Sequence, residues 1–399
     1  MLYNLKKKND SLKGTPLLKN QSHLFNLNNE VTYLNCSYMS PMLRSVAQVG
    51  VEAIYKRDNP TDIKQSDFFY NKSRLRDEFA KLINADSKSC VIIPSVSYGM
   101  ANVAKNLKAG KGDNIVVADE QFPSNIYAWM ALEKNKGIEL KRVAPPKNSK
   151  NRGKLWNEQL FQTIDQNTKM VACGHVHWTD GTLFDLMTIR KRADEVGAIL
   201  VIDGTQSIGA LPFDVQQIKP DALVVAGYKW LMGPYACGVA YYGDYFADGL
   251  PIENNWMNRL NSEDFTNLIN YQQNYQSGMM RYEVGESTNF ILAPMLTRAL
   301  EQVNQWGPAN IQAYTEQLTK PYVEELKYLG CSIEVEEYRS HHLFGVRLPE
   351  DISLEKLKEV FVREKIYVSV RGNSIRVASH LYNNHVDFKN LLNAFKQLK

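Results

Sequence analysis

The sequence predicts an α/β protein with a large, mostly parallel sheet and a smaller α+β domain at the C-terminal end. Short apolar runs, each ended abruptly by polar residues, recur between helix-length segments through the first part of the chain. Short strand-like and helix-like segments alternate beyond residue 330. The 399 residues also exceed what one ordinary hydrophobic core holds, which indicates two domains.

We expect residues 1–30 to form an N-terminal tail, residues 31–275 the large domain and residues 276–399 the small domain. The lysine-rich start, MLYNLKKKNDSLKG, is not followed by an apolar segment, so it is not typical of a secretory signal. A nucleic-acid-binding arm is the weaker interpretation, because the net charge of the whole chain is only +4. A solvated tail, a cytoplasmic location and no nucleic-acid partner are therefore expected.

Composition excludes several other classes of protein. No apolar run approaches the roughly 18 residues of a membrane helix, so no membrane partner is expected. The five cysteines are scattered and form no CxxC pair, which argues against a disulfide or zinc framework. The chain contains no Walker A loop, HExxH motif or G-x-G-x-x-G fingerprint.

Helical periodicity predicts helices within residues 43–82, with a break at Pro60, and within residues 294–329. Residues 243–274 are polar and typical of a loop. In the C-terminal domain, the segments predicted as strands are SIEVEE, LFGVRLP, YVSVRG and SIRVAS, and the predicted helices are LEKLKEVFVREK and FKNLLNAFKQL.

Two sequence patterns typical of buried strands, near the middle of the chain, are each followed by a side chain that could take part in catalysis. The apolar run 198–202 stops at Asp203, and the run 222–226 is followed closely by Lys229. Ligands of open α/β sheets bind outside the carboxyl ends of the strands, so both groups are expected in one crevice. Pyridoxal phosphate chemistry needs such a lysine for its Schiff base and such an acid beside the pyridine nitrogen. On spacing alone, solvated turn residues are the more common explanation.

The amino-acid sequence around this pair matches a specific family signature. VIDGTQSIGA followed by AGYKWLMGPYACG resembles the signature of class V aminotransferases, which are fold-type I pyridoxal phosphate enzymes and include cysteine desulfurases, isopenicillin N epimerases, kynureninases and carbon–sulfur lyases. The resemblance implies pyridoxal 5'-phosphate as the cofactor, bound to Lys229 as a Schiff base. It also implies that Asp203 pairs with the pyridine nitrogen and Gln206 with the phenolic oxygen. Tyr228 matches the kynureninases, where this phenol contacts the phosphate.

A strand, a turn and the start of a helix follow one another at residues 90–107. The free N–H groups and the dipole of such a helix start bind phosphate, although serines there more commonly just cap the helix. The family resemblance implies that Ser97 and Tyr98 hold the cofactor phosphate through their backbone, and Ser97 also through its hydroxyl.

A second aromatic contact is expected just past the strand at residues 114–118. Phe122 precedes Pro123 there, and the resemblance implies that its ring stacks on the cofactor as in kynureninases. A core position for Phe122 remains the alternative. Trp178 stands where desulfurases carry an asparagine, and an indole cannot replace the amide as an acceptor. His175 and His177 have a spacing that could ligate a metal, but no third ligand stands nearby, so no metal is expected.

The segment SIRVASHLYNN resembles the part of the family in which an arginine clamps the substrate carboxylate, and Arg376 is the match. The segment RYEVGESTNF resembles one whose threonine reaches the neighbouring subunit's phosphate. Here Glu286 replaces that threonine, so Ser287 or Thr288 would have to substitute. A shared site of this type implies a homodimer.

The expected reaction is on a small amino-acid substrate, with Lys229 as the base for the α-proton. Carbon–sulfur β-elimination is favoured, amino transfer comes next and epimerisation third. A non-catalytic protein of this fold is disfavoured because both Lys229 and the phosphate-binding segment are present. A persulfide-forming desulfurase is also disfavoured, because no thiol lies between Val370 and Arg376 and only Cys36 could substitute near the entrance.

Overall fold

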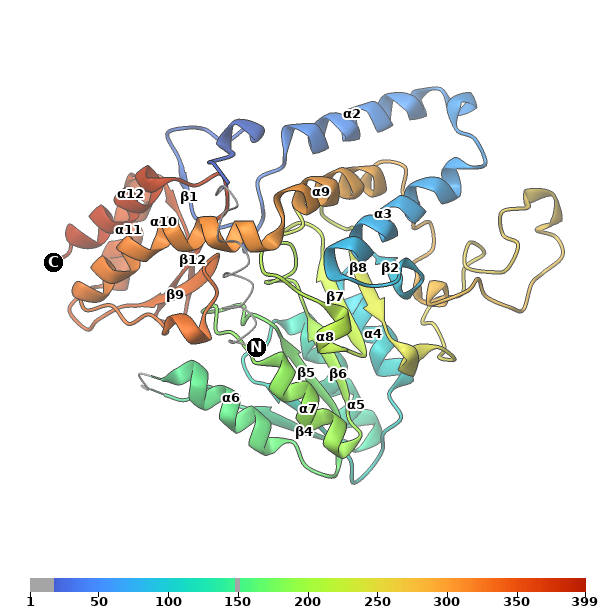
Figure 1. Ribbon diagram of the computed structural model, residues 1–399, viewed down its shortest axis with the longest axis horizontal. Coiled ribbons are helices and arrows are strands. Elements are labelled where there is room, and N and C mark those ends of the chain that lie inside the picture. Colours follow the sequence, from blue (N-terminus) through green and yellow to red (C-terminus); the bar gives the residue numbers. More distant parts are fainter. Residues whose placement is uncertain (1–17, 148–150) are drawn as a thin grey trace.

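The computed structural model of the chain describes residues 18–147 and 151–399, and it has a seven-stranded central sheet beside a smaller antiparallel one (Figure 1). The central strand order is β2-β8-β7-β6-β5-β3-β4, and β8 alone runs opposite to the other six strands. The predicted α/β class with a mostly parallel sheet is therefore confirmed. The strands are β2 (Cys90–Ile93), β3 (Asn114–Ala118), β4 (Glu139–Val143), β5 (Thr168–Gly174), β6 (Ile199–Asp203), β7 (Ala222–Ala226) and β8 (Gly238–Tyr242).

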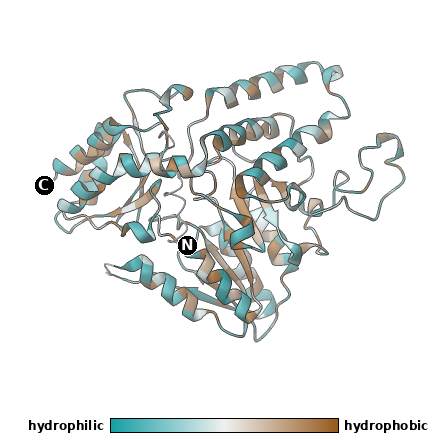
Figure 2. Ribbon diagram, viewed as in Figure 1, coloured by the Kyte–Doolittle hydropathy of each residue, from teal (hydrophilic) through white to brown (hydrophobic). Residues whose placement is uncertain are grey.

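Helices cover both faces of this sheet, which explains why its inner strands are apolar throughout and appear as the most hydrophobic part of the chain (Figure 2). One core cluster packs the sheet against α3, α6, α7 and α9, and the other packs it against α4 and α5. The helices are α2 (Arg44–Asp58), α3 (Asp67–Ile83), α4 (Val96–Asn106), α5 (Tyr127–Lys136), α6 (Arg152–Thr163), α7 (Leu186–Val196), α8 (Val215–Ile218), α9 (Leu292–Trp306), α10 (Pro308–Tyr328), α11 (Leu354–Arg363) and α12 (His385–Lys396).

The C-terminal part has its own core, which packs a three-stranded antiparallel sheet against α10, α11 and α12. Its strands are β9 (Leu343–Arg347), β11 (Ser369–Arg371) and β12 (Ser374–Ala378), in the order β11-β12-β9. The strand predicted at residues 332–337 is wrong. Only Ser332 forms a bridge, to Arg347, and a 3-10 helix follows at Glu336–Tyr338.

The N-terminal segment belongs to the C-terminal part of the fold. Strand β1 (Thr32–Tyr33) pairs in parallel with β10 (Ile366–Tyr367). Phe25, within the expected tail of residues 1–30, is only 2% exposed and packs on the rings of Trp306 and Tyr382. Residues 1–17 of the predicted tail lie outside the described residues.

Helix α9 packs on α2 and α3 of the large part, although it lies beyond residue 276. The domain boundaries at residues 30 and 275 therefore stay predictions. Residues 250–275 contain only one short helical turn and extend from the body of the protein (Figure 1). Within the described residues, none of the helices combines the length and the apolar character that a membrane crossing requires.

Candidate active site

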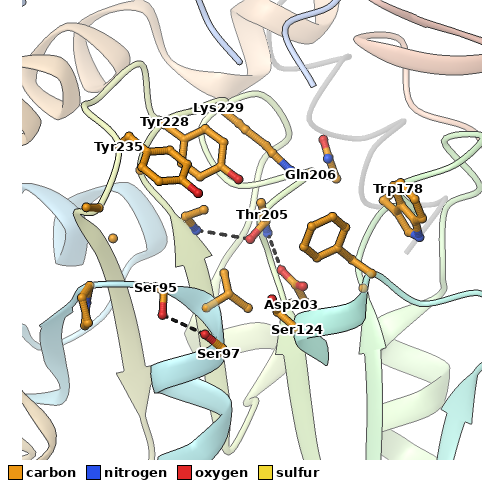
Figure 3. A pocket seen from close by; sticks show the side chains of 18 of the residues that line it. Ser95, Ser97, Ser124, Trp178, Asp203, Thr205, Gln206, Tyr228, Lys229 and Tyr235 are labelled. Atoms are coloured by element: carbon orange, nitrogen blue, oxygen red, sulfur yellow. Dashed lines mark hydrogen bonds between the residues drawn. The ribbon is translucent and has the colours of Figure 1, made fainter. Parts of the chain in front are cut away.

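A pocket of about 340 Å³ opens at the carboxyl ends of β6 and β7, where the parallel strands place Asp203 and the turn that carries Lys229 (Figure 3). This volume lies in the usual range for a small-molecule site. Of the residues predicted for the site, the lining includes Ser97, Phe122, Asp203, Gln206, Tyr228 and Lys229. The lining does not include Tyr98 or Arg376.

Asp203 is the last residue of β6, and its carboxylate lines the pocket. The backbone N–H of Thr205 donates to its Oδ1 at 3.0 Å, and this turn fixes the direction of the side chain. Burial raises the pKa of Asp203, while the hydrogen bonds from Thr205 and the charge of Lys229 oppose the shift. Because burial disfavours the charged form of Asp203, a cationic N–H group of a bound ligand would stabilise its carboxylate.

Lys229 follows β7 after a short turn, and its side chain is 6% exposed. Its Nζ lies 5.3 Å from the ring centroid of Phe122 and 5.6 Å from that of Tyr228. Burial lowers the pKa of Lys229 to about 8. The charge of Asp203 opposes this shift, and two arginines, Arg376 and Arg371, add to it.

This lowered pKa predicts how cofactor uptake depends on pH. Only the neutral amine attacks an aldehyde, so the rate at which the cofactor-free protein forms a borohydride-fixable linkage should rise as the pH passes through about 8. For an ordinary lysine the rise would lie near pH 10.4, at the roughly unperturbed pKa of its amine. Stopped-flow absorbance of the linked cofactor measures the rate, and a rise only near the ordinary value would contradict the burial of Lys229.

The phosphate-binding segment is the start of α4. Ser95 caps this helix, because its Oγ accepts from the backbone N–H of Tyr98 at 3.2 Å. The hydroxyls of Ser95 and Ser97 lie 2.9 Å apart and both residues line the pocket. Tyr98 points elsewhere, and its hydroxyl donates to Glu253 at 3.2 Å. The geometry therefore supports Ser97 as a phosphate contact together with Ser95, but gives no support to Tyr98.

Aromatic rings form the other wall. Phe122 is 38% exposed, so the alternative that it is simply a core residue is wrong. Its ring meets the ring of Trp178 edge to face at 5.4 Å, and the Trp178 indole N–H donates to the carbonyl of Glu120 at 2.6 Å. The rings of Tyr228 and Tyr235 lie 4.7 Å apart and both line the pocket.

The amide of Gln206 is held on two sides. Its Nε2 donates to the carbonyl of Ser37 at 3.1 Å, and its Oε1 accepts from the indole of Trp230 at 2.9 Å. Because Trp230 can only donate, the amide oxygen must face the indole and the NH₂ group must lie on the other side. Within the described residues this group has one acceptor, the Ser37 carbonyl, and Gln206 lines the pocket.

Arg376 lies on β12 beside the pocket wall and is 1% exposed. Its Nη1 donates to the carbonyl of Trp178 at 2.7 Å, and its Nη2 donates to the hydroxyl of Ser369 at 3.2 Å. Its Nε is buried without a hydrogen-bond partner. Burial lowers the pKa of Arg376 to about 9, with the charge of Arg371 as a second cause. A buried guanidinium with neutral partners fits an anionic ligand.

Sequence reasoning missed Thr205, Tyr235 and Arg371 as residues of this neighbourhood. Thr205 could have been found, since it follows Asp203 by two residues and such spacing is typical of a carboxylate-capped turn. Arg371 required the pairing of β11 with β12.

The segment expected to reach a neighbouring subunit is folded back on its own chain. Ser287 and Thr288 are each 2% exposed. The Ser287 hydroxyl donates to Glu283 Oε1 at 2.9 Å, and the Thr288 hydroxyl donates to the carbonyl of Phe68. Neither hydroxyl therefore points outward, and the exposed residues beside them are Glu286 and Asn289.

The two histidines with metal-ligand spacing pack in separate surroundings. The ring of His177 lies 4.7 Å from that of Trp156, and the ring of His175 lies 5.7 Å from that of Phe213. No cluster of three metal-ligating side chains among residues 18–147 and 151–399 includes either of them.

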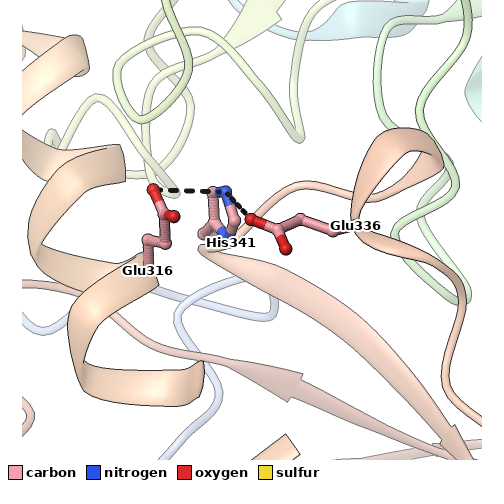
Figure 4. Close-up of side chains that lie close together, drawn as sticks. All are labelled: Glu316, Glu336 and His341. Carbon is pink, nitrogen blue, oxygen red and sulfur yellow. Dashed lines mark ion pairs between the residues drawn. The ribbon is translucent and has the colours of Figure 1, made fainter. Parts of the chain in front are cut away.

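A different cluster joins α10 to the start of β9. His341 Nε2 lies 3.7 Å from Glu316 Oε2 and 3.9 Å from Glu336 Oε1 (Figure 4). The two carboxylates also interact with the buried guanidinium of Arg339, opposing the effect of its burial on its pKa. Arg339 therefore offsets part of their charge, and none of these residues lines the pocket.

The pocket fits each part of pyridoxal phosphate. Asp203 offers a carboxylate for the pyridine N–H, and Phe122 offers a ring face. The first turn of α4 offers N–H groups and two hydroxyls for the phosphate, and Lys229 offers an amine for the aldehyde.

Comparisons with known proteins agree with this arrangement. The family model described as Aminotransferase class-V matches residues 64–390. The protein named "Uncharacterized aminotransferase YcbU" from Bacillus subtilis (strain 168) is 25% identical over 354 residues, which are 88% of this chain and 89% of that protein. A probable cysteine desulfurase from Methanothermobacter thermautotrophicus is 25% identical over 331 residues, which are 77% of this chain and 78% of that protein.

Two solved structures share the fold. The apo cysteine desulfurase from Thermococcus onnurineus NA1 has a TM-score of 0.80 at 20% identity, covering 96% of this chain and 98% of that one. The cystine C-S lyase C-DES, in complex with its reaction product cysteine persulfide, has a TM-score of 0.81 at 20% identity. The match covers 92% of this chain and 97% of that one. Because the family model matches most of the sequence, the chain belongs to the class V aminotransferase family of pyridoxal phosphate-dependent enzymes.

Proposed function

We propose that this enzyme acts at the α-carbon of an amino acid and eliminates a sulfur-bearing β-substituent, without a persulfide-forming cysteine. The observation that carries the proposal is that Asp203 and Lys229 line one pocket and that Arg376 donates to the carbonyl of Trp178 in its wall. The thiols are buried, including that of Cys237 in the pocket lining. The likeness of the fold to a cystine C-S lyase supports the choice of elimination.

Bound pyridoxal phosphate supplies the electron sink that makes the α-proton acidic. Asp203 keeps a proton on the pyridine nitrogen, because its buried carboxylate favours a cationic neighbour. Arg376 orients the α-carboxylate with two parallel hydrogen bonds. Lys229 then takes the α-proton at Nζ, and its lowered pKa of about 8 leaves a useful fraction neutral near physiological pH. The rings of Phe122 and Trp178 give this wall an apolar surface.

An amino-acid panel tests the reaction. The purified enzyme is incubated with sulfur-containing and other amino acids while pyruvate, ammonia, sulfide and oxoacids are measured. We expect pyruvate and ammonia in equal amounts together with a released sulfur product. Oxoacid formation that depends on an added amino acceptor would instead support amino transfer, the second candidate, which the name of the Bacillus subtilis relative favours.

Thiol modification tests the absence of a persulfide step. All five cysteines are buried, and burial raises the pKa of Cys36 and that of the pocket-lining Cys237 to about 12, which disfavours the thiolate form of both. Treating the native enzyme with iodoacetamide, or replacing Cys36 by serine, should leave turnover within about twofold of wild type. Mass spectrometry after turnover should find no protein persulfide. A substrate-dependent persulfide on any cysteine, with activity lost on its mutation, would restore the desulfurase mechanism.

A homodimer is part of the same proposal. Helix α2 exposes Val51, Ile54 and Tyr55 on one stripe, at 44%, 50% and 68% of their surface. A second hollow of about 740 Å³ meets the active-site pocket at Pro94, Ala236 and Cys237. A partner subunit seated there would close the site from outside. Sedimentation equilibrium measures the mass, and a monomer at working concentrations that retains full activity would contradict the shared site.

A further inference from the structure

A second arginine stands beside Arg376 on the same face of one hairpin. In the β11–β12 pair, Ser369 lies opposite Arg376 and Arg371 lies opposite Ser374. Side chains two residues apart on a strand share a face, so Arg371 lies on the face of Ser369 and Arg376. The hairpin turn is only two residues long, and Gly372 adopts a φ of +56°, which fixes the register.

Both guanidinium groups meet the pocket wall at the same residue. The Arg371 guanidinium lies 5.0 Å from the ring centroid of Trp178, and Arg376 donates to the Trp178 carbonyl at 2.7 Å. Trp178 itself lines the pocket and contacts the ring of Phe122, next to Lys229. Stacking on an indole holds a guanidinium in place while leaving its N–H edge free to bind an anion.

Neither arginine has an acidic partner among the described residues. Among the ion pairs of residues 18–147 and 151–399, none includes Arg371 or Arg376. Within the described residues, Arg371 Nη1 donates to the carbonyl of its neighbour Val370, at 2.8 Å, and its Nε is buried without a hydrogen-bond partner. The neighbouring strand shows the contrast, since Arg347 pairs with Asp180 at 2.6 Å. Burial lowers the pKa of Arg371 as well, which agrees with the lack of a counter-ion.

Arg371 and Arg376 thus place two positive charges at the Trp178 wall of the pocket. A single α-carboxylate requires only one of these guanidinium groups. We infer that Arg371 binds a second acidic group at the end of the substrate side chain, so that the substrate is an amino acid with an acidic side chain. This inference rests on the proposed function, in which Arg376 takes the α-carboxylate. A hydrogen-bonded charge pair is specific, because a neutral analogue leaves the guanidinium unpaired.

Matched substrate pairs test the inference on the cofactor-loaded enzyme. The pairs are aspartate with asparagine, glutamate with glutamine, and S-carboxymethylcysteine with S-methylcysteine. Each amino acid is titrated while the cofactor absorbance is followed, which gives a dissociation constant even without turnover. Wild type should bind the acidic member of at least one pair about 10- to 100-fold more tightly than the neutral member, and kcat/KM should differ in the same direction.

The variant Arg371→Gln should lose this preference while the dissociation constants of the neutral members stay within about twofold. Arg371→Lys keeps the charge and should retain part of the preference. Arg363→Gln is the control, because this exposed arginine lies on α11 and pairs with Glu364. This variant should leave the dissociation constants of both members of every pair unchanged.

Three results would overturn the inference. One is a wild type that binds the neutral members as tightly as the acidic members. Another is an Arg371→Gln variant that weakens both members of a pair equally, which would mean that both arginines hold the α-carboxylate. The last is a wild type in which no amino acid changes the cofactor absorbance. That result would overturn the proposed function itself, and the inference with it.

Discussion

Replacing Lys229 by alanine should abolish the covalent attachment of the cofactor and lower turnover at least about a thousandfold, because the same amine both links the cofactor and moves the α-proton. The absorbance spectrum of the lysine-linked cofactor should be replaced by the spectrum of free pyridoxal phosphate. Borohydride reduction followed by dialysis should leave no bound cofactor. Lys134→Ala is the control, since this lysine lies exposed in the last turn of α5.

The Lys229→Ala protein should remain folded, because the side chain that is removed lines a pocket and its burial disfavours the charged amine. Circular dichroism checks the fold. If this variant still fixes cofactor covalently after reduction, the linkage is at another lysine and the proposed role of Lys229 is wrong.

Replacing Arg376 by lysine should lower kcat/KM for the preferred amino acid about 100-fold, because an ammonium keeps the charge but loses the two parallel hydrogen bonds of the guanidinium. Lysine also cannot keep both present contacts, to the Trp178 carbonyl and the Ser369 hydroxyl. Steady-state kinetics gives the change. Cofactor content, measured by absorbance after denaturation in alkali, should equal that of wild type.

The exposed Arg363 supplies the comparison for this substitution, and Arg363→Lys should behave as wild type. Unchanged kinetics in Arg376→Lys would remove Arg376 from the substrate site. Loss of cofactor from this variant would assign Arg376 a structural role at the pocket wall instead.

Sequence patterns predicted the parts of the site that depend on strand ends. Asp203 and Lys229 follow apolar runs that are strands β6 and β7 in the structure, and the sheet brings parallel strand ends together. The start of α4 was predictable in the same way, since Ser95 and Ser97 stand between a strand and a helix. These features are local, so a short stretch of sequence contains them.

The features that sequence did not predict depend on contacts between distant segments. Phe25 lies in a polar context, and only the rings of Trp306 and Tyr382 explain its burial. Arg371 shares a face with Arg376 because of the register of a hairpin, and its link to the pocket runs through Trp178. The family resemblance implies a phosphate contact for Tyr98, but its amide donates to the helix cap Ser95 and its phenol donates to Glu253.

Peptide mapping of the native enzyme after borohydride reduction tests the central claim most directly. Reduction converts the linkage between the cofactor and its lysine into a stable amine, which survives proteolysis. Tandem mass spectrometry should then find the phosphopyridoxyl group on the peptide that contains Lys229, at a stoichiometry near one per chain. A cofactor attached to a different lysine, or a native enzyme that carries none after saturation with pyridoxal phosphate, would contradict the account.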